Sequence, residues 1–332
     1  MAMIGKCLIG IIIILGLVYL FGPKPDFPMY DLRPAYLKKP LDKLDGFIAE
    51  EEAKVSDIKT DNESRIIWYG DSIAQTEYSL VYLHGFSAGH EEGDPVHTEF
   101  AKRYGMNLYL PRLHDHGRES KDMFKGLTPK DLIASAKDAI AVGALLGKKV
   151  ILMSCSTGGT YSVMLAPQDP RVHSLIMYSP NVELADPMAK LVTYPWGRQL
   201  LKKVIGGEHT NITHYSSEQE KYWSRSYHID GIVALQSLID DGMREDLFGT
   251  LDIPTYIGCY YKDDENQDNV VSVSAMRDLF KNISTSNDQK VMQEFPDAGR
   301  HVFTSHVMVD SFDTVLNETF KFAEEKLNLR QI

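Results

Sequence analysis

Residues 149–159 read KVILMSCSTGG, an apolar run that ends in a turn of small residues. The part at 149–153 has the length and composition of a buried strand, and the residues after the turn suit a helix. A Ser-x-Ser-x-Gly pattern at a strand-to-helix junction predicts a nucleophile elbow with Ser156 on the sharp turn. The positions two places away, Ser154 and Gly158, must be small because the turn presses the chain against its neighbours. Ser154 replaces the glycine that is common there.

Strand and helix patterns alternate on both sides of this turn. Strands are expected at 65–69, 78–83, 106–110, 174–178, 255–260 and 290–295, and helices at 128–147, 274–281 and 310–327. Alternation of this kind builds a mostly parallel sheet that is flanked by helices. The predicted fold class is therefore α/β.

The alternation lapses after residue 180, where helical patterns dominate up to residue 250. A structureless loop of such length is rare in a compact domain, so we expect a helical cap at 181–250 over the carboxyl edge of the sheet. The cap divides the α/β core into a first part at 61–180 and a second part at 251–332. A Pro-rich connector and a short amphipathic helix are expected before the core, at 23–60.

The N-terminal segment is continuously apolar from residue 7 to residue 21, with the sequence CLIGIIIILGLVYLF. About fifteen residues lie between the length of a signal-peptide core and that of a spanning helix. A cleavage after Gly22 would place the large Leu20 where signal peptidase requires a small residue. We therefore expect an uncleaved transmembrane signal anchor at 1–22 and a single-pass membrane location. A cleaved secretory signal and a buried core helix are the alternatives, and charges on both flanks assign no side of the membrane.

The charge and the cysteines narrow the function class further. The chain has a formal net charge of -11 and no long basic block or zinc-finger spacing, which argues against nucleic acid as a partner. Cys155 and Cys259 stand in apolar runs and are expected to be small buried residues.

A second motif, His84-Gly85-Phe86, ends a strand upstream of the elbow. The backbone N–H groups of Phe86 and of Thr157 are expected to form an oxyanion hole. A preorganised donor of this kind contributes about 3 to 4 kcal/mol to catalysis. His84 is expected to shape the loop and not to transfer a proton.

Position along the chain selects the remaining catalytic candidates. His301 follows the last predicted strand and precedes the final helix, so it is the expected general base. The acid that orients it should lie in the loop at 262–271. Asp268 is favoured because Val270 and Val271 return the chain to the core after it, and Asp264 is the rival.

The order Ser156, Asp268 and His301, with the loop at 84–86 and a cap, resembles the α/β-hydrolase superfamily over residues 60–327. The sequence LHDHGRES at 113–120 is similar to the His-Gly-x-Ser loop of monoacylglycerol lipases and related carboxylesterases. The resemblance implies two-step acyl transfer through an acyl-enzyme on Ser156. It implies no organic cofactor and no metal, and His114 and His116 in that loop lack a third ligand in a recognisable pattern.

The substrate implied by this resemblance is a small-molecule or lipid ester, including monoacylglycerols. A peptidase or an acyltransferase on the same three residues is an alternative, because one fold hosts many functions. A catalytically silent, membrane-tethered binding module is another. An apolar stretch of the cap at 188–201 is expected to be either the core of a helical lid or a hydrophobic acyl pocket.

Overall fold

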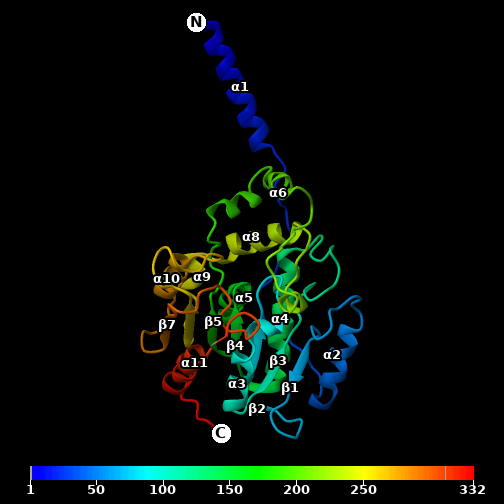
Figure 1. Ribbon diagram of the computed structural model, residues 1–332, viewed down its shortest axis with the longest axis vertical. Helices are drawn as coiled ribbons and strands as arrows, with labels where there is room; N and C mark the ends of the chain where they lie inside the picture. Colours follow the sequence, from blue (N-terminus) through cyan, green and yellow to red (C-terminus); the bar gives the residue numbers. More distant parts are fainter. Residues whose placement is uncertain (1, 311) are drawn as a thin grey trace.

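The computed structural model describes residues 2–310 and 312–332. Seven strands of the described chain form one sheet in the order β1-β3-β2-β4-β5-β6-β7 (Figure 1). Their bounds are β1 (Arg65–Ile67), β2 (Thr76–Leu83), β3 (Asn107–Leu110), β4 (Gly147–Cys155), β5 (Val172–Tyr178), β6 (Thr255–Cys259) and β7 (Lys290–Glu294). Only the β1–β3 pair in this sheet is antiparallel. The predicted α/β class with a mostly parallel sheet is confirmed.

The central strands are apolar on both faces because helices cover both. In β2, Leu80 and Tyr82 pack into one core cluster, while Val81 and Leu83 pack into the other. This alternation follows from the two-residue period of a strand. A parallel sheet buried on both sides requires near-continuous apolar strands, and the run at 149–153 met that requirement.

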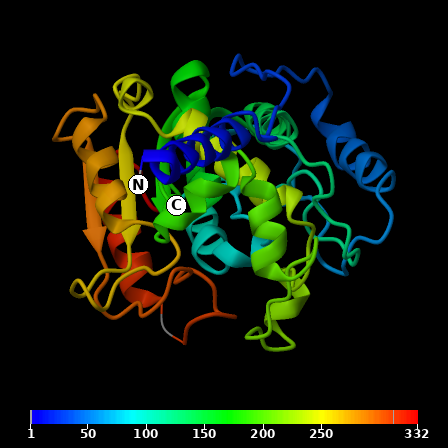
Figure 2. The same cartoon turned by 90° about the horizontal axis from the view of Figure 1, so that it is seen from above.

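The helices on the two faces of the sheet pack into two different core clusters. The first core cluster is built with α4 (Pro129–Leu146), α5 (Thr157–Leu165), α8 (Asp230–Gly242) and α10 (Val273–Asn282), and the second with α3 (Val96–Arg103) and α11 (Asp313–Glu325). Seen along the long axis, α2 (Leu44–Glu52) lies at one edge of the molecule and β7 with α10 at the other (Figure 2). Short 3-10 turns are η1 (Leu41–Lys43), η2 (His90–Gly93), η3 (Ala166–Gln168) and η4 (Pro187–Thr193).

The start of α4 illustrates how local sequence sets an element. The side chain of Thr128 accepts from the Asp131 N–H at 3.3 Å, and Asp131 Oδ2 accepts from the Thr128 N–H at 3.0 Å. Pro129 occupies the first turn, where its missing N–H costs nothing. The helix predicted at 128–147 is confirmed.

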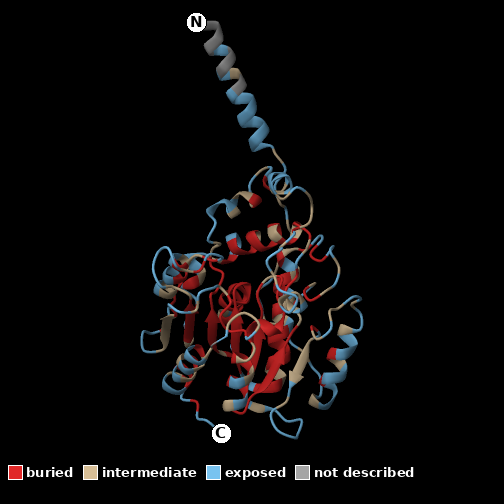
Figure 3. Cartoon of the chain, viewed as in Figure 1, coloured by how far each residue is buried: buried red, intermediate tan, exposed pale blue. Residues whose placement is uncertain are grey.

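Residues 181–250 contain α6 (Gly197–Ile205), α7 (Gln219–Tyr222), α8 and α9 (Glu245–Phe248). Figure 1 shows α8 and α6 stacked above one end of the sheet, with α8 nearer to the strands. The two helices differ in solvent exposure, because α8 is largely buried and α6 is largely exposed (Figure 3). The buried α8 packs against α4 and α5.

The N-terminal segment forms α1 (Ala2–Leu20), which projects from the body beyond α6 (Figure 1). Trp196 holds its base, since its backbone N–H donates to Pro23 O at 2.8 Å and its Nε1 donates to Val18 O at 3.0 Å. Among the described residues, no helix is long and apolar enough to cross a membrane. The transmembrane anchor predicted for 1–22 stays a prediction.

Candidate active site

Ser156 stands at the junction of β4 and α5 with a backbone that L-residues rarely adopt, at φ 54° and ψ -121°. Strain of this kind persists only where the surroundings impose it. Here the Ser156 N–H donates to Tyr178 O at 3.0 Å, and Ser156 O accepts from the Asn181 N–H at 2.9 Å. Hydrogen bonds on both sides therefore fix the turn that projects this hydroxyl.

The small residues around the turn allow close approach to neighbouring chain segments. A Cβ at Gly158 would lie 1.8 Å from Leu83 O, so no larger residue fits without a shift of the backbone. Ser154 is fully buried, and its hydroxyl accepts from Ser162 Oγ at 3.2 Å. The serine in place of the common glycine is thus accommodated by a buried hydrogen bond.

His301 and Asp268 meet behind the elbow. His301 Nδ1 lies 2.7 Å from Asp268 Oδ2, and the Asp268 side chain is fully buried. Asp268 Oδ1 accepts from the N–H groups of Val270 at 2.9 Å and Val271 at 3.1 Å. Burial alone would raise the pKa of Asp268, but His301 and these two backbone donors together lower it. Asp268 is therefore held as an anion, able to fix an Nδ1–H tautomer of His301.

The other ring nitrogen of His301 is free for proton transfer. Its Nε2 is buried and has no hydrogen-bond partner among the described residues. The structure brings Asp268 to this histidine and leaves Asp264 away from it. Asp264 is exposed, and its carboxylate accepts from Tyr261 Oη at 2.9 Å.

The loop at 84–86 presents backbone donors to the same region. The Leu113 N–H donates to His84 Nε2 at 3.1 Å, so the Nδ1–H of that ring donates to Gly85 O at 2.9 Å. Burial lowers the pKa of His84 well below its ordinary value, which keeps the ring neutral. Within the described chain, the N–H groups of Phe86 and Thr157 donate to no other group. His84 shapes the loop, as predicted.

One pocket of about 770 Å³ brings four of the five predicted residues together. Ser156, Thr157, Phe86 and His301 line it, while Asp268 lies buried behind His301. The volume is in the range of small-molecule sites. Its apolar walls come from Leu184, Ile212, Tyr215, Trp223, Tyr227, Ile232, Leu235, Val270, Val302 and Met308.

The apolar stretch at 188–201 does not line this pocket, which corrects the suggestion that it forms the acyl site. Its large side chains lie on the outer elements η4 and α6, where Met188 is 61% and Leu200 48% exposed. Within the predicted cap, the apolar walls come instead from Leu184 and from the chain at 212–235. The cap has an outer part, η4 and α6, and an inner part that faces the pocket. Both parts contain apolar residues, so hydrophobicity alone does not show which residues face the pocket.

Glu92 is a site residue that the sequence analysis missed. It is 2% exposed and lines the pocket, and its Oε2 accepts from the Gly85 N–H at 2.7 Å and from Tyr82 Oη at 3.2 Å. A Cβ at Gly85 would lie 2.6 Å from Glu92 Oε1 and 3.0 Å from the Cβ of Ser156. Burial raises the pKa of Glu92 to about 7, although Gly85, His301 and Tyr82 oppose the rise. The sequence shows only two adjacent acids, Glu91 and Glu92, and their burial beside Gly85 is visible only in the structure.

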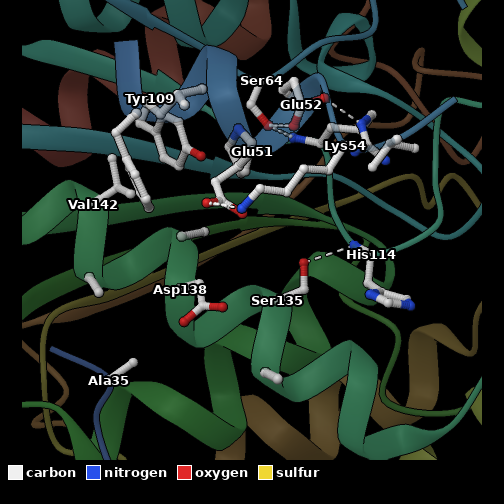
Figure 4. Close-up of a pocket in the computed structure, with 18 of the residues that line it drawn as sticks. Ala35, Glu51, Glu52, Lys54, Ser64, Tyr109, His114, Ser135, Asp138 and Val142 are labelled. Atoms are coloured by element: carbon white, nitrogen blue, oxygen red, sulfur yellow. Dashed lines mark hydrogen bonds and ion pairs between the residues drawn. The ribbon is translucent and has the colours of Figure 1, made fainter. Parts of the chain in front are cut away.

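A second cavity, of about 830 Å³, lies between α2 and α4 and contains none of the predicted catalytic residues (Figure 4). His114 lines it together with Ser135 and Asp138. His116 is instead buried, with its ring 4.9 Å from that of His84. The two histidines of the loop at 113–120 therefore lie in different environments, His114 in this cavity and His116 in the interior.

No family model and no curated protein matches the chain. Solved structures do match it. A structure reported for LipS and LipT, two metagenome-derived lipolytic enzymes, has a TM-score of 0.63 at 17% identity and covers 80% of this chain and 98% of its own. The monoacylglycerol lipase of Paleococcus ferrophilus has a TM-score of 0.53 at 13% identity, covering 78% and 96%.

An enol-lactonase from Burkholderia xenovorans LB400 has a TM-score of 0.52 at 15% identity, covering 80% of this chain and 98% of its own. Such identities establish the fold and leave the reaction to the site. With the sheet order, the elbow and these neighbours, the chain is an α/β-hydrolase-fold protein.

Proposed function

We propose that this protein is a serine hydrolase that cleaves carboxylic esters through an acyl-enzyme on Ser156. One observation carries the proposal. The pocket that holds the strained Ser156 also holds His301, whose Nδ1 is bound to a buried carboxylate and whose Nε2 has no partner among the described residues. A nucleophile, a base and an orienting acid in this relation are the elements of acyl transfer.

The first half of the reaction forms the acyl-enzyme. Ser156 Oγ attacks the ester carbonyl carbon while His301 Nε2 takes its proton. The Asp268 carboxylate stabilises the imidazolium that results. The N–H groups of Phe86 and Thr157 donate to the oxyanion, and Thr157 is also the first residue of α5, where the helix dipole favours negative charge.

The second half releases the acid. The imidazolium gives its proton to the departing alcohol, whose C–O bond breaks as the carbonyl re-forms. Water then attacks the acyl carbon and passes its proton to His301 Nε2. The bond between the acyl carbon and Ser156 Oγ then breaks, and His301 Nε2 returns the proton to Ser156 Oγ. The carboxylic acid leaves, which completes the cycle.

The walls of the pocket support an aliphatic acyl group, and therefore lipid esters including monoacylglycerols. Leu184, Ile212 and Leu235 supply apolar surface in the pocket that Ser156 lines. Each methylene that leaves water contributes about 0.8 kcal/mol, so chain length should strengthen binding until the pocket is filled. The lipolytic neighbours fit the same substrate class.

The test is hydrolysis of p-nitrophenyl esters from acetate to palmitate, of a monoacylglycerol, and of a peptide amide. Wild type should cleave the esters, and Ser156→Ala should not. Ser284→Ala is the matched control, because its hydroxyl is exposed and donates only to Gly249 O in the described chain. Cleavage of the peptide alone would favour a peptidase, and transfer to an added alcohol in preference to water would favour an acyltransferase.

We also propose that the N-terminal helix associates with a lipid surface. The large apolar side chains that the structure describes at Ile9 and at 12–21 are exposed, among them Leu15 at 62% and Leu20 at 69%. Exposed apolar surface of this extent marks an interaction site. Removal of residues 1–22 should release the protein from vesicles without loss of short-ester hydrolysis, since no proposed catalytic residue precedes Phe86. Equal sedimentation of the full and shortened chains with vesicles would refute the association.

A further inference from the structure

The buried carboxyl group of Glu92 contacts the loop that carries one of the proposed oxyanion donors. Its Oε2 accepts from the Gly85 N–H at 2.7 Å and from Tyr82 Oη at 3.2 Å. Glu92 is 2% exposed and takes no part in the proton transfers of ester cleavage. Burial of a carboxyl group is costly. An apolar side chain would avoid that cost, so packing alone does not account for an acid at this position.

Gly85 is the residue whose conformation this hydrogen bond controls. A Cβ at Gly85 would lie 2.6 Å from Glu92 Oε1 and 3.0 Å from the Cβ of Ser156, so the loop approaches the nucleophile too closely for a side chain. Glycine restricts its own φ and ψ less than any other residue does. The conformation of the loop must therefore be imposed by groups outside Gly85.

Hydrogen bonds hold Gly85 on both sides. Glu92 binds its N–H, while its carbonyl oxygen accepts from His84 Nδ1 at 2.9 Å and from the Ala88 N–H at 3.3 Å. In a planar trans peptide, the C=O of Gly85 and the N–H of Phe86 point in opposite directions. The groups that fix Gly85 therefore also fix the direction of the Phe86 N–H, which is a proposed oxyanion donor.

Glu92 is itself held by separate segments of the chain. The fully buried Thr304, which follows His301 in the sequence, donates from its Oγ1 to Glu92 O at 2.7 Å. The Glu92 N–H donates to Gly89 O at 3.2 Å, and Tyr82 in β2 binds the carboxyl group. These contacts make Glu92 a fixed support for Gly85, joined both to the sheet and to the loop of the proposed general base.

We propose that Glu92 is a positioning residue of the oxyanion hole, whose carboxyl group holds Gly85 so that the Phe86 N–H points at the oxyanion. This inference rests on the proposed ester hydrolysis. A misplacement of about 1 Å at a catalytic group can cost about 10²-fold in rate. Because the oxyanion develops only on the way to the tetrahedral intermediate, loss of this support should lower kcat and leave KM nearly unchanged.

The test compares two substitutions at this position. Glu92→Met removes the acceptor at similar side-chain length, and Glu92→Gln retains it. In steady-state hydrolysis of p-nitrophenyl butyrate, we expect kcat about 10- to 100-fold lower for Glu92→Met, with KM within about twofold of wild type. Glu92→Gln should keep kcat within about threefold of wild type, because its amide oxygen still accepts from Gly85.

Glu91→Met is the matched control, since the adjacent Glu91 is also buried but does not line the pocket. Its kcat should stay within about twofold of wild type. Glu92→Leu serves in place of Glu92→Met should the methionine variant fail to fold.

Hydrogen exchange, measured by mass spectrometry, is a second readout that does not depend on ester hydrolysis. The Gly85 amide should exchange about three- to tenfold faster in Glu92→Met than in wild type, and at the wild-type rate in Glu92→Gln. Unchanged exchange at 150–152, in the central strand β4, identifies a folded variant.

The proposal is overturned if Glu92→Met keeps the wild-type kcat, if Glu91→Met loses as much, or if Glu92→Gln is as slow as Glu92→Met. Wild-type exchange of the Gly85 amide in Glu92→Met would also overturn it. A wild-type protein that cleaves no ester would instead refute the proposed function, and hydrogen exchange would still decide whether Glu92 holds the loop.

Discussion

Asp268 Oδ2 lies 2.7 Å from His301 Nδ1, although 33 residues separate the two in the chain. The carboxylate is fully buried, and two backbone N–H groups hold its other oxygen. These two backbone donors therefore fix the orientation of the Asp268 carboxylate independently of His301. This contact determines which nitrogen of His301 faces the pocket.

Asp268→Asn should lower kcat about 10³- to 10⁴-fold, because an amide can stabilise the wrong imidazole tautomer and offers no negative charge. Asp264→Asn should leave kcat within about twofold, since an exposed carboxylate away from His301 exerts a screened effect. Steady-state hydrolysis of a p-nitrophenyl ester measures both. A larger loss in the Asp264 variant would transfer the acid role to that residue.

Gly158→Ala should destabilise the fold by about 1 to 3 kcal/mol, because its Cβ would meet Leu83 O at 1.8 Å and the backbone would have to move. Gly46→Ala is the control. It lies in the exposed part of α2 with no atom within 4 Å of the added carbon, and should stabilise by about 0.5 to 1 kcal/mol. Urea denaturation measures both, and equal stabilities would mean that the elbow is not close-packed.

The contribution of Glu92 to the unfolding free energy should fall as the pH rises from about 4.5 to 7. The buried His84 contributes in the opposite direction, because its folded pKa is lowered and the unfolded state binds the extra proton. The folded pKa of Glu92 is raised from 4.5 to about 7 by burial, so the native state binds more protons than the unfolded state in this window. A shift of this size corresponds to roughly 3 kcal/mol. Glu91, also raised to about 7 by burial and by Asp94, acts in the same direction.

Glu92→Gln should remove the contribution of this carboxyl group, because the amide oxygen still accepts from Gly85 but does not ionise. The unfolding free energy of the variant relative to wild type should therefore rise between pH 5 and pH 8. Urea denaturation at pH 5 and pH 8 gives the two free energies. Glu265→Gln, at an exposed loop position, should retain the wild-type slope. An unchanged slope in the Glu92 variant would mean that this carboxylate stays ionised in the folded protein at pH 5.

Ile212→Trp should raise KM for long-chain esters more than for acetate, because the larger ring fills part of the pocket that an acyl chain would occupy. Met188→Trp should change neither KM, since this exposed side chain of η4 lies outside the pocket. Comparison of the two variants across ester lengths decides between the walls seen in the structure and the stretch at 188–201. The opposite pattern would return the acyl pocket to that stretch.

The sequence was informative where one physical requirement restricts each residue. At 149–159, a buried strand must be apolar and a tight turn must be small, so β4, the elbow and the start of α5 were all predictable. The position of Asp268 before two apolar residues likewise favoured it as the carboxylate beside His301. These signals are local, and the contacts they predict are present.

Other features depend on which segments meet in space. Glu92 reaches Gly85 only because η2 folds back over the loop at 84–86, and nothing in the spacing indicates that return. The cap residues of the pocket could not be separated from those of its outer surface, because both kinds are apolar. The length of the N-terminal apolar run also did not decide whether the segment spans a membrane or is a cleaved signal. Its association with a lipid surface stays a proposal.

The central claim is a nucleophilic Ser156, and active-site labelling tests it most directly. The full chain is reacted with a fluorophosphonate, digested and analysed by mass spectrometry, with and without prior incubation with a long-chain ester. We expect one phosphonyl group per chain on Ser156, slower labelling in the presence of the ester, and no labelling of Ser156→Ala. Labelling of another serine, or equal labelling of the folded Ser156→Ala variant, would contradict it.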